Sequence, residues 1–216
     1  MDLRSRILKA ASDLYGETGF RGTTTRQIAR RAGVNEVTLF RQFGTKTALL
    51  HEAIKCACGQ PEQPGLPEHP RDPRAELVEW AGRTWTALWK RRGVIRTTMS
   101  EIEAHPELFP RENSPTACAG RDLAGYVARL RGAGIARAEF DTAAATAMLM
   151  GCLFADAMSR DIMPVAYRTE PERAIAEYVD LFLRAIGAPA RSGDGRGADP
   201  GGARRARRDL RPMETR

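Results

Sequence analysis

Cationic, hydroxyl and amide side chains gather between Thr25 and Lys46, and these are the side chains that bind phosphates and the edges of bases. Four consecutive residues lie at the start of a predicted helix, where short side chains can reach base edges from one helix face; they are Asn35, Glu36, Val37 and Thr38. Phe40, Arg41 and Gln42 lie one turn further along the same helix. Together they predict a surface that contacts double-stranded DNA.

Two short helices joined by a tight turn are predicted to position these side chains. Thr24, followed three residues later by Gln27, forms a capping box, so the first helix begins near Thr25. Gly33 ends it, because glycine adopts the left-handed conformation of a helix C-terminus at little steric cost. Asn35 can cap the second helix, whose apolar stripe is expected to be Val37, Phe40 and Phe43. The pattern predicts a helix-turn-helix whose second helix enters a DNA major groove.

The same segment resembles the DNA-binding domain of the TetR/AcrR family of bacterial transcriptional regulators. The matching residues are Thr24, Thr25, Arg26, Ile28, Ala29, Ala32, Gly33, Val34, Thr38, Leu39, Phe40, Phe43, Lys46 and Leu49. Residues 6–8, 14–15 and 19–20 resemble the first helix of that domain and its exit, so the resemblance covers about residues 4–55.

The resemblance implies phosphate contacts from Thr25, Phe40, Gln42 and Lys46, with Arg26 and residues 36–38 nearer the bases. Position 40 is commonly tyrosine in the family, and Phe40 has no hydroxyl to donate to a phosphate. Glu36 carries a negative charge toward the groove, so it either accepts from a cytosine amino group or points away. Arg30 and Arg31 are expected to form a solvated basic face, whereas Arg26 and Arg41 are expected to contact DNA.

The distribution of charged residues and prolines indicates where the domains of the chain begin and end. Residues 1–50 hold nine Lys and Arg against four acidic residues, the pattern of a DNA-binding domain. Prolines at 61, 64, 67, 70 and 73 predict an extended surface linker. Residues 188–216 are expected to be disordered, because they hold eight arginines and little to bury.

From residue 74 onward the chain reads as helical, with no convincing strand. Helices are predicted over residues 74–92, ended by Gly93, then 94–104, 116–132, 143–159 and 171–186. The predicted fold is all-α. It consists of a three-helix DNA-binding domain (1–58), a Pro-rich linker (59–73), a helical regulatory and dimerisation domain (74–187) and a basic tail (188–216).

A homodimer is expected, because one helix-turn-helix reads too little DNA alone. Residues 143–159 are too apolar for a helix with one buried face, and residues 172–186 supply a second helix for a four-helix interface, as in the resembling family. The predicted interface residues are Ala144, Ala147, Gly151, Ala155, Ile175, Tyr178, Val179 and Phe182.

A pocket for a small, fairly apolar effector is expected inside the helical domain, although for any single residue an ordinary core position is the stronger interpretation. The candidate lining residues are Trp85, Trp89, Met99, Ile102, Phe109, Tyr126, Met148, Cys152 and Met158.

The favoured function is a dimeric repressor that such a ligand releases from a palindromic operator. The alternatives are a constitutive or architectural DNA-binding protein and a transcriptional activator. No Ser/His/Asp or Cys/His arrangement, phosphate-binding Gly-rich loop or metal-ligand cluster is found, so neither an enzyme nor a cofactor is expected. Without a signal peptide or a long apolar run, the protein is expected to be cytoplasmic.

Overall fold

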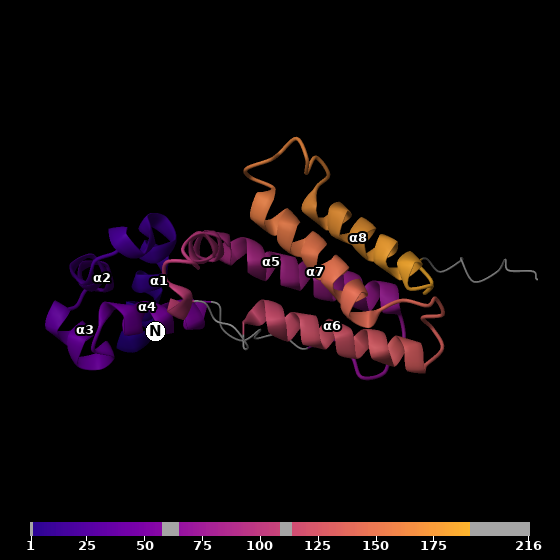
Figure 1. Cartoon of the computed structure of the whole chain (residues 1–216), viewed down its shortest axis with the longest axis horizontal. Helices are drawn as coiled ribbons and strands as arrows, with labels where there is room; N and C mark the ends of the chain where they lie inside the picture. The colour runs from indigo at the N-terminus through magenta and orange to yellow at the C-terminus, as the bar shows by residue number, and fades with distance from the viewer. Residues whose placement is uncertain (1, 58–64, 109–113, 191–216) are drawn as a thin grey trace, which may run out of the picture.

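The computed structural model describes residues 2–57, 65–108 and 114–190. In these ranges the chain is all-helical, as predicted (Figure 1). The elements are α1 (Leu3–Gly22), α2 (Thr25–Ala32), α3 (Glu36–Phe43), α4 (Lys46–Ala57), α5 (Pro73–Ser100), the 3-10 turn η1 (Pro106–Leu108), α6 (Pro115–Gly132), α7 (Thr142–Ser159) and α8 (Pro171–Ala185). We call α1–α4 the head and α5–α8 the body.

The head packs around its own apolar core. Ile7, Ala11 and Tyr15 of α1 are fully buried against Ile28 of α2 and Ile54 of α4. Leu108 of η1 also belongs to this core, so the segment that follows α5 returns to the head. α2 and α3 lie at the end of the molecule that is farthest from α8 (Figure 1).

The body forms a second core between α5, α6, α7 and α8. Asp141 caps α7, and α8 begins at Pro171, where the sequence predicted the last helix to start. Gly187, with a positive φ of 68°, follows the end of α8. The Arg74 guanidinium donates to buried Asp180 at 2.7 Å and so ties the first turn of α5 to α8.

The prediction that Gly93 ends a helix was wrong, because α5 continues through it to Ser100. Gly93 faces Gly16 of α1, and together they bring the two helix backbones close. A Cβ atom added to Gly16 would lie 3.2 Å from the Val94 amide nitrogen, whereas one added to Gly93 would lie 4.0 Å from the Gly16 carbonyl oxygen. This glycine pair therefore serves packing between the head and the body.

Both ends of the body differ from the predicted domain boundaries. Residues 65–72 of the predicted linker are attached to α6: the Asp122 carboxylate accepts the Leu66 amide at 3.0 Å, and the Leu66 side chain is buried. Ala188 and Ala190, predicted as disordered tail, are buried in the body core. The remaining parts of these two predictions, residues 59–64 and 191–216, lie outside the described residues.

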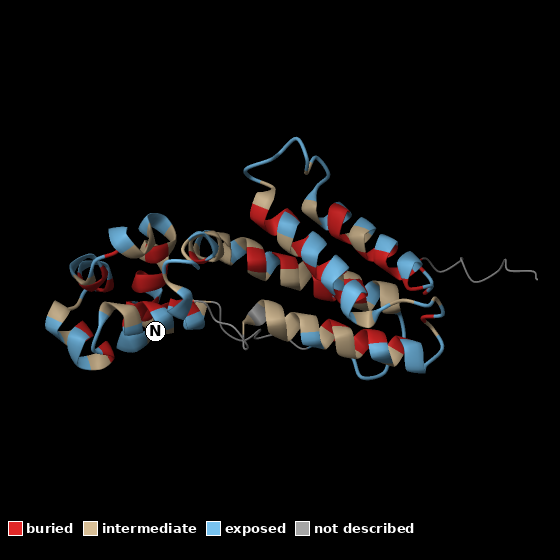
Figure 2. Ribbon diagram, in the orientation of Figure 1, coloured by how far each residue is buried: buried red, intermediate tan, exposed pale blue. Residues whose placement is uncertain are grey.

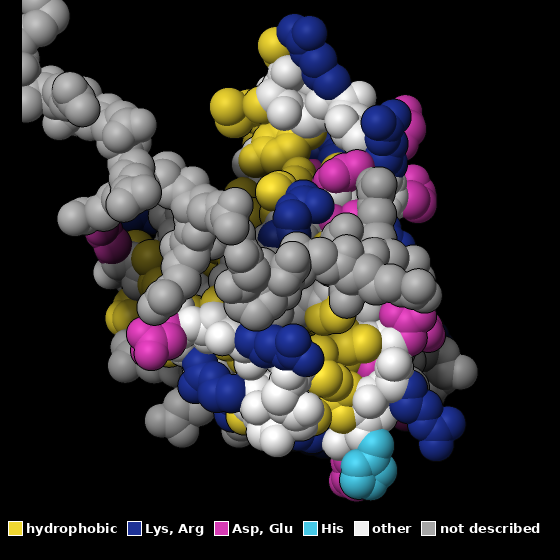
Figure 3. Space-filling view, turned by 90° about the vertical axis from the view of Figure 1, so that its right-hand side faces the viewer, with side chains coloured by type: hydrophobic (Ala, Val, Ile, Leu, Met, Phe, Trp, Pro, Cys, Tyr) yellow, Lys and Arg dark blue, Asp and Glu magenta, His cyan; other side chains and the backbone are white. Residues whose placement is uncertain are grey.

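The connection between α7 and α8 projects from the body and exposes Ile162, Met163 and Val165. Hydrophobic side chains gather near the top of the end view, where this connection lies (Figure 3). Arg160 anchors its base by donating to the carbonyl oxygen of Tyr167 at 3.2 Å. Asp161 pairs with two arginines of α5, and the hydrogen bonds from Arg96 hold its pKa at about 2.

Candidate nucleic-acid interface

The helix-turn-helix forms through the local signals that the sequence contains. The Thr24 hydroxyl accepts the Gln27 amide, and the Gln27 side chain accepts the Thr24 amide, which completes the predicted capping box. Gly33 ends α2 in the left-handed conformation, with φ 65° and ψ 44°. The Asn35 side chain accepts the Val37 amide at 3.0 Å and so begins α3. The turn between α2 and α3 is therefore fixed at both ends.

α3 is held in the head by one face and presents the other face to solvent. Leu39 and Phe43 are buried in the head core, whereas Val37 is 70% exposed and Phe40 is 49% exposed. The predicted apolar stripe was therefore wrong for Val37 and Phe40, because Leu39 and not these two residues packs inward together with Phe43. Both exposed residues are candidates for DNA contact, and their exposure keeps them available.

Several polar candidates of α2 and α3 are engaged within the head. The Thr25 hydroxyl donates to the Glu36 carboxylate, which joins the first turns of α2 and α3. Gln42 turns its Oε1 atom inward, where no donor among the described residues meets it. Thr38 is half-buried. Of the two orientations considered for Glu36, the unbound chain has the one in which its carboxylate points to a neighbouring helix.

The arginines of α2 and α3 fall into two groups. Arg31 donates to Glu17 through two bonds of 2.9 Å, and this pair belongs to the solvated surface. Arg26, Arg30 and Arg41 are exposed, and within the described part of the chain no acidic side chain pairs with them. These three guanidinium groups are free to meet phosphates.

Lys46 has a role within the chain that the sequence did not predict. Its ammonium donates to the carbonyl oxygen of Phe20 and lies 4.2 Å from the centre of the Phe20 ring. Burial lowers the pKa of Lys46, and the charge of Glu101 opposes that shift. Because an ammonium has three N–H donors, the bond to Phe20 leaves Lys46 able to bind a phosphate as well.

Phe20 is the centre of a joint between the head and the body, formed by residues that no sequence motif singled out. The Phe20 amide donates to the Glu101 carboxylate at 2.9 and 3.1 Å, across 81 positions of sequence. The Phe20 ring lies 3.9 Å, centre to centre, from the ring of His105. Thr97 of α5 donates to the Gly16 carbonyl at 3.2 Å. The joint fixes the end of α1, and with it the helix-turn-helix, relative to α5.

The predicted dimer residues divide between two environments. On α7, Ala144, Ala147, Gly151 and Ala155 are exposed on one face (Figure 2). α7 is long and apolar enough to cross a membrane by length and composition, and 44% of it is buried in the body. On α8 the prediction was wrong for Ile175, Val179 and Phe182, which are buried in the core of their own chain.

Tyr178 of α8 also points into its own chain, where it meets a buried carboxylate. Its hydroxyl donates to Asp156 at 2.8 Å, and Asp156 also accepts from Trp85 and Arg160, each at 2.8 Å. Burial raises the pKa of Asp156, but the hydrogen bonds from Arg160, Tyr178 and Trp85 outweigh that effect, and the pKa lies below its usual value. The outward residue on α8 is Leu181, which is 57% exposed.

The residues predicted to line an effector pocket do not come together in the body. Met99, Ile102, Met148 and Cys152 are exposed, because they lie on the outer faces of α5, α7 and the segment after α5. Trp85 and Trp89 stack at 5.3 Å, and Met158 is buried in the same body core. Tyr126 is also buried but donates to Glu76, more than two helical turns from Trp85 along α5. Phe109 lies outside the described residues.

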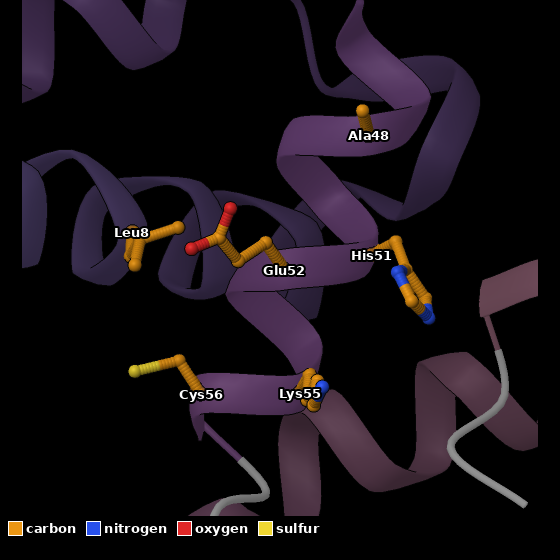
Figure 4. Close-up of a pocket in the computed structure, with 6 residues that line it drawn as sticks. All are labelled: Leu8, Ala48, His51, Glu52, Lys55 and Cys56. Atoms are coloured by element: carbon orange, nitrogen blue, oxygen red, sulfur yellow. The ribbon is translucent and has the colours of Figure 1, made fainter. Parts of the chain in front are cut away.

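A pocket of about 600 Å³ opens instead on the head, between α1 and α4 (Figure 4). It is a shallow surface hollow lined by Leu8, Ala48, His51, Glu52, Lys55 and Cys56. The Glu52 carboxylate is paired with Arg4 across this surface. Its mixed polar lining differs from the apolar site that the sequence predicted.

Comparison with known proteins agrees with the geometry of the head. Residues 7–53 match the family of bacterial regulatory proteins described as the tetR family. The transcriptional repressor Rv3405c of Mycobacterium tuberculosis is 45% identical over 49 residues, which are 23% of this chain and 26% of that protein. The chain thus spans about a quarter of the length of this curated relative.

Solved structures extend the similarity to the body. A TetR transcriptional regulator from Agrobacterium tumefaciens superimposes with a TM-score of 0.68 at 19% identity, over 85% of this chain and 93% of that one. FadR from Bacillus subtilis, in complex with stearoyl-CoA, gives a TM-score of 0.60 at 17% identity, over 84% and 98%. At these identities the likeness concerns the fold. Residues 7–53 therefore form a domain of the tetR family of bacterial regulatory proteins, and the described chain shares its fold with solved TetR regulators.

Proposed function

We propose that this chain is a sequence-specific DNA-binding transcriptional regulator. The observation that carries the proposal is the two-sided environment of α3. Leu39 and Phe43 hold the helix in the head, while the opposite face stands free at the tip of the molecule. Arg41 of α3 and Arg26 of α2 are exposed, and no acidic side chain of the described residues pairs with them. A rigid helix with free cations beside it suits insertion into a major groove.

We propose that the protein binds DNA as a homodimer through the exposed face of α7. The small side chains of Ala144, Ala147, Gly151 and Ala155 allow close approach of a second helix, and exposed Leu181 of α8 extends the same apolar character. A two-fold arrangement sets two copies of α3 about 34 Å apart, which is one turn of DNA.

Gly151 offers a direct test of the dimer. Nothing lies within 4 Å of a Cβ atom built on it, so Gly151→Arg leaves the isolated fold undisturbed. The variant is expected to sediment as a monomer and to bind DNA much more weakly. Gly132→Arg, at an equally open position of α6, is the matched control and is expected to stay dimeric. A dimeric Gly151→Arg protein would contradict this interface.

We propose that the regulator is a repressor that a small, fairly apolar ligand releases. The similar Rv3405c is named a repressor, and the similar FadR was solved with stearoyl-CoA. The stacked Trp85 and Trp89 and the buried Met158 belong to one apolar core of the body, and they are the candidates that we retain for contact with such a ligand. A constitutive DNA-binding protein and an activator are the competing functions.

Selection of genomic fragments by the purified full-length protein tests the proposed function. The expected result is enrichment of fragments that share an inverted repeat with half-sites one DNA turn apart. Transcription from the neighbouring promoters, measured with and without the protein, separates repression from activation. Fragments bound without any shared sequence would overturn specific regulation and favour an architectural protein.

A further inference from the structure

The outer face of α3 presents two large apolar side chains that the fold does not use. Val37 and Phe40 are 70% and 49% exposed, and the cores of the head and the body are complete without them. They stand three residues apart, so they are neighbours on one helix face with Cβ atoms about 5–6 Å apart. Exposed apolar groups of this size on a fixed helix call for a function outside the fold.

Three polar neighbours of this pair direct a side-chain oxygen toward the chain itself. Glu36 accepts from the Thr25 hydroxyl, and the Asn35 side-chain oxygen accepts the Val37 amide. The side-chain oxygen of Gln42 points inward. Val37 and Phe40 are the exposed apolar side chains of α3, because Leu39 and Phe43 are buried in the head.

Bases present one apolar group in the major groove, the 5-methyl of thymine. We propose that Val37 and Phe40 form a thymine-methyl reader, in which each side chain packs on the methyl group of one thymine in each operator half-site. The inference rests on the proposed function and identifies which base feature α3 recognises. Phe40, which lacks a hydroxyl for a phosphate, thereby faces a base instead.

The spacing of the two side chains limits where the thymines lie. Their separation of about 5–6 Å along the helix compares with about 3.4 Å between successive bases of one strand. Val37 and Phe40 are therefore expected to contact thymines in adjacent base pairs or in two base pairs with one other pair between them. The two thymines can belong to either strand, because both present their methyl groups in the same groove.

Uracil replaces thymine without changing base pairing and removes only the methyl group, so it tests the inference directly. A high-affinity duplex is first selected from a random pool with the full-length protein, then synthesised with deoxyuridine at one thymine at a time. At each contacted position, binding by the wild-type protein is expected to weaken about fourfold, the effect of losing one buried methyl group. At all other thymines the change is expected to be below about twofold.

Two variants assign the two methyl contacts, and a third variant is the control. Val37→Ala is expected to lose sensitivity to uracil at one thymine of each half-site, and Phe40→Ala at the other. Both residues are exposed, so neither change removes core packing, and unchanged urea unfolding midpoints verify this. Arg41→Ala is the control: it lowers affinity for both duplexes and keeps the ratio of thymine to uracil binding.

Two outcomes would overturn the thymine-methyl reader: no effect of uracil on the wild-type protein, or an equal effect in Val37→Ala, Phe40→Ala and wild type. The second result would place the methyl effect in DNA shape. Failure to select any preferred duplex is a different result, because it would overturn the proposed function itself.

Discussion

The contact of Gly16 with α5 leads to opposite predictions for two glycine-to-alanine changes. In a helix, alanine is about 0.5–1 kcal/mol more favourable than glycine. At Gly93 the new methyl group meets its nearest neighbour, the Gly16 carbonyl oxygen, at 4.0 Å, which is ordinary contact. Gly93→Ala is therefore expected to raise the free energy of unfolding by about 0.5–1 kcal/mol.

At Gly16 the methyl group would lie 3.2 Å from the backbone nitrogen of Val94, which cannot rotate away as a side chain can. Overpacking of this kind costs about 1–3 kcal/mol, and the better helix propensity of alanine offsets only part of it. Gly16→Ala is expected to lower the free energy of unfolding by about 1 kcal/mol, so the two variants differ by about 2 kcal/mol.

Equilibrium unfolding in urea, followed by tryptophan fluorescence and circular dichroism at one protein concentration, measures this difference. Gly82→Ala is the control for helix propensity, because it lies in α5 with nothing within 4 Å of the added Cβ atom. It is expected to resemble Gly93→Ala. A Gly16→Ala protein as stable as Gly93→Ala would refute the close approach of α1 and α5.

Three further predictions concern charge. Lys46→Ala should weaken binding to the selected duplex and to random DNA alike, and reduce the slope of log K against log salt by about one; an unchanged slope would remove Lys46 from the interface. Asp161→Asn should destabilise the protein above about pH 4, and its difference from wild type should vanish toward pH 2. The reason is that a carboxylate whose pKa is lower in the folded protein than in the unfolded chain stabilises the fold above the unfolded pKa and loses this effect as the pH falls. A difference in stability that does not depend on pH would contradict the ion pairs of Asp161. Deleting residues 191–216 should leave selected-duplex affinity within about twofold at moderate salt and lower random-DNA affinity; lost specific binding would show that the tail takes part in recognition.

The short-range features of the head were predictable because their causes are local. A cap depends on a side chain and an amide two or three residues away, and Thr24 and Asn35 both make the predicted contacts. The inward face of α3 was not predictable in the same way. Val37, Leu39, Phe40 and Phe43 are all apolar, so several stripes fit the helical period, and packing against the other head helices decides among them.

Features that join distant segments could not be read from spacing. A glycine at position 93 is typical of a helix end, but Gly93 packs against Gly16, which lies far away in the sequence. No sequence pattern predicts the hydrogen bond from the Phe20 amide to the Glu101 carboxylate. On α8, hydrophobicity alone does not say whether Phe182 is buried within one chain or between two. A predicted interface needs the fold of the single chain before its residues can be assigned.

Because α5 is one continuous helix, a tilt of its end in the body also displaces its end at the head. Twenty-eight helical residues span about 42 Å, with α8 attached near one end and the Phe20 joint at the other. A tilt of about 5° about the body end moves the far end by about 4 Å, more than the step of about 3.4 Å between base pairs. A break at Gly93 would have absorbed such a tilt. With an unbroken helix, a tilt of about 5° in the body is expected to displace the end of α5 at the Phe20 joint by about 4 Å.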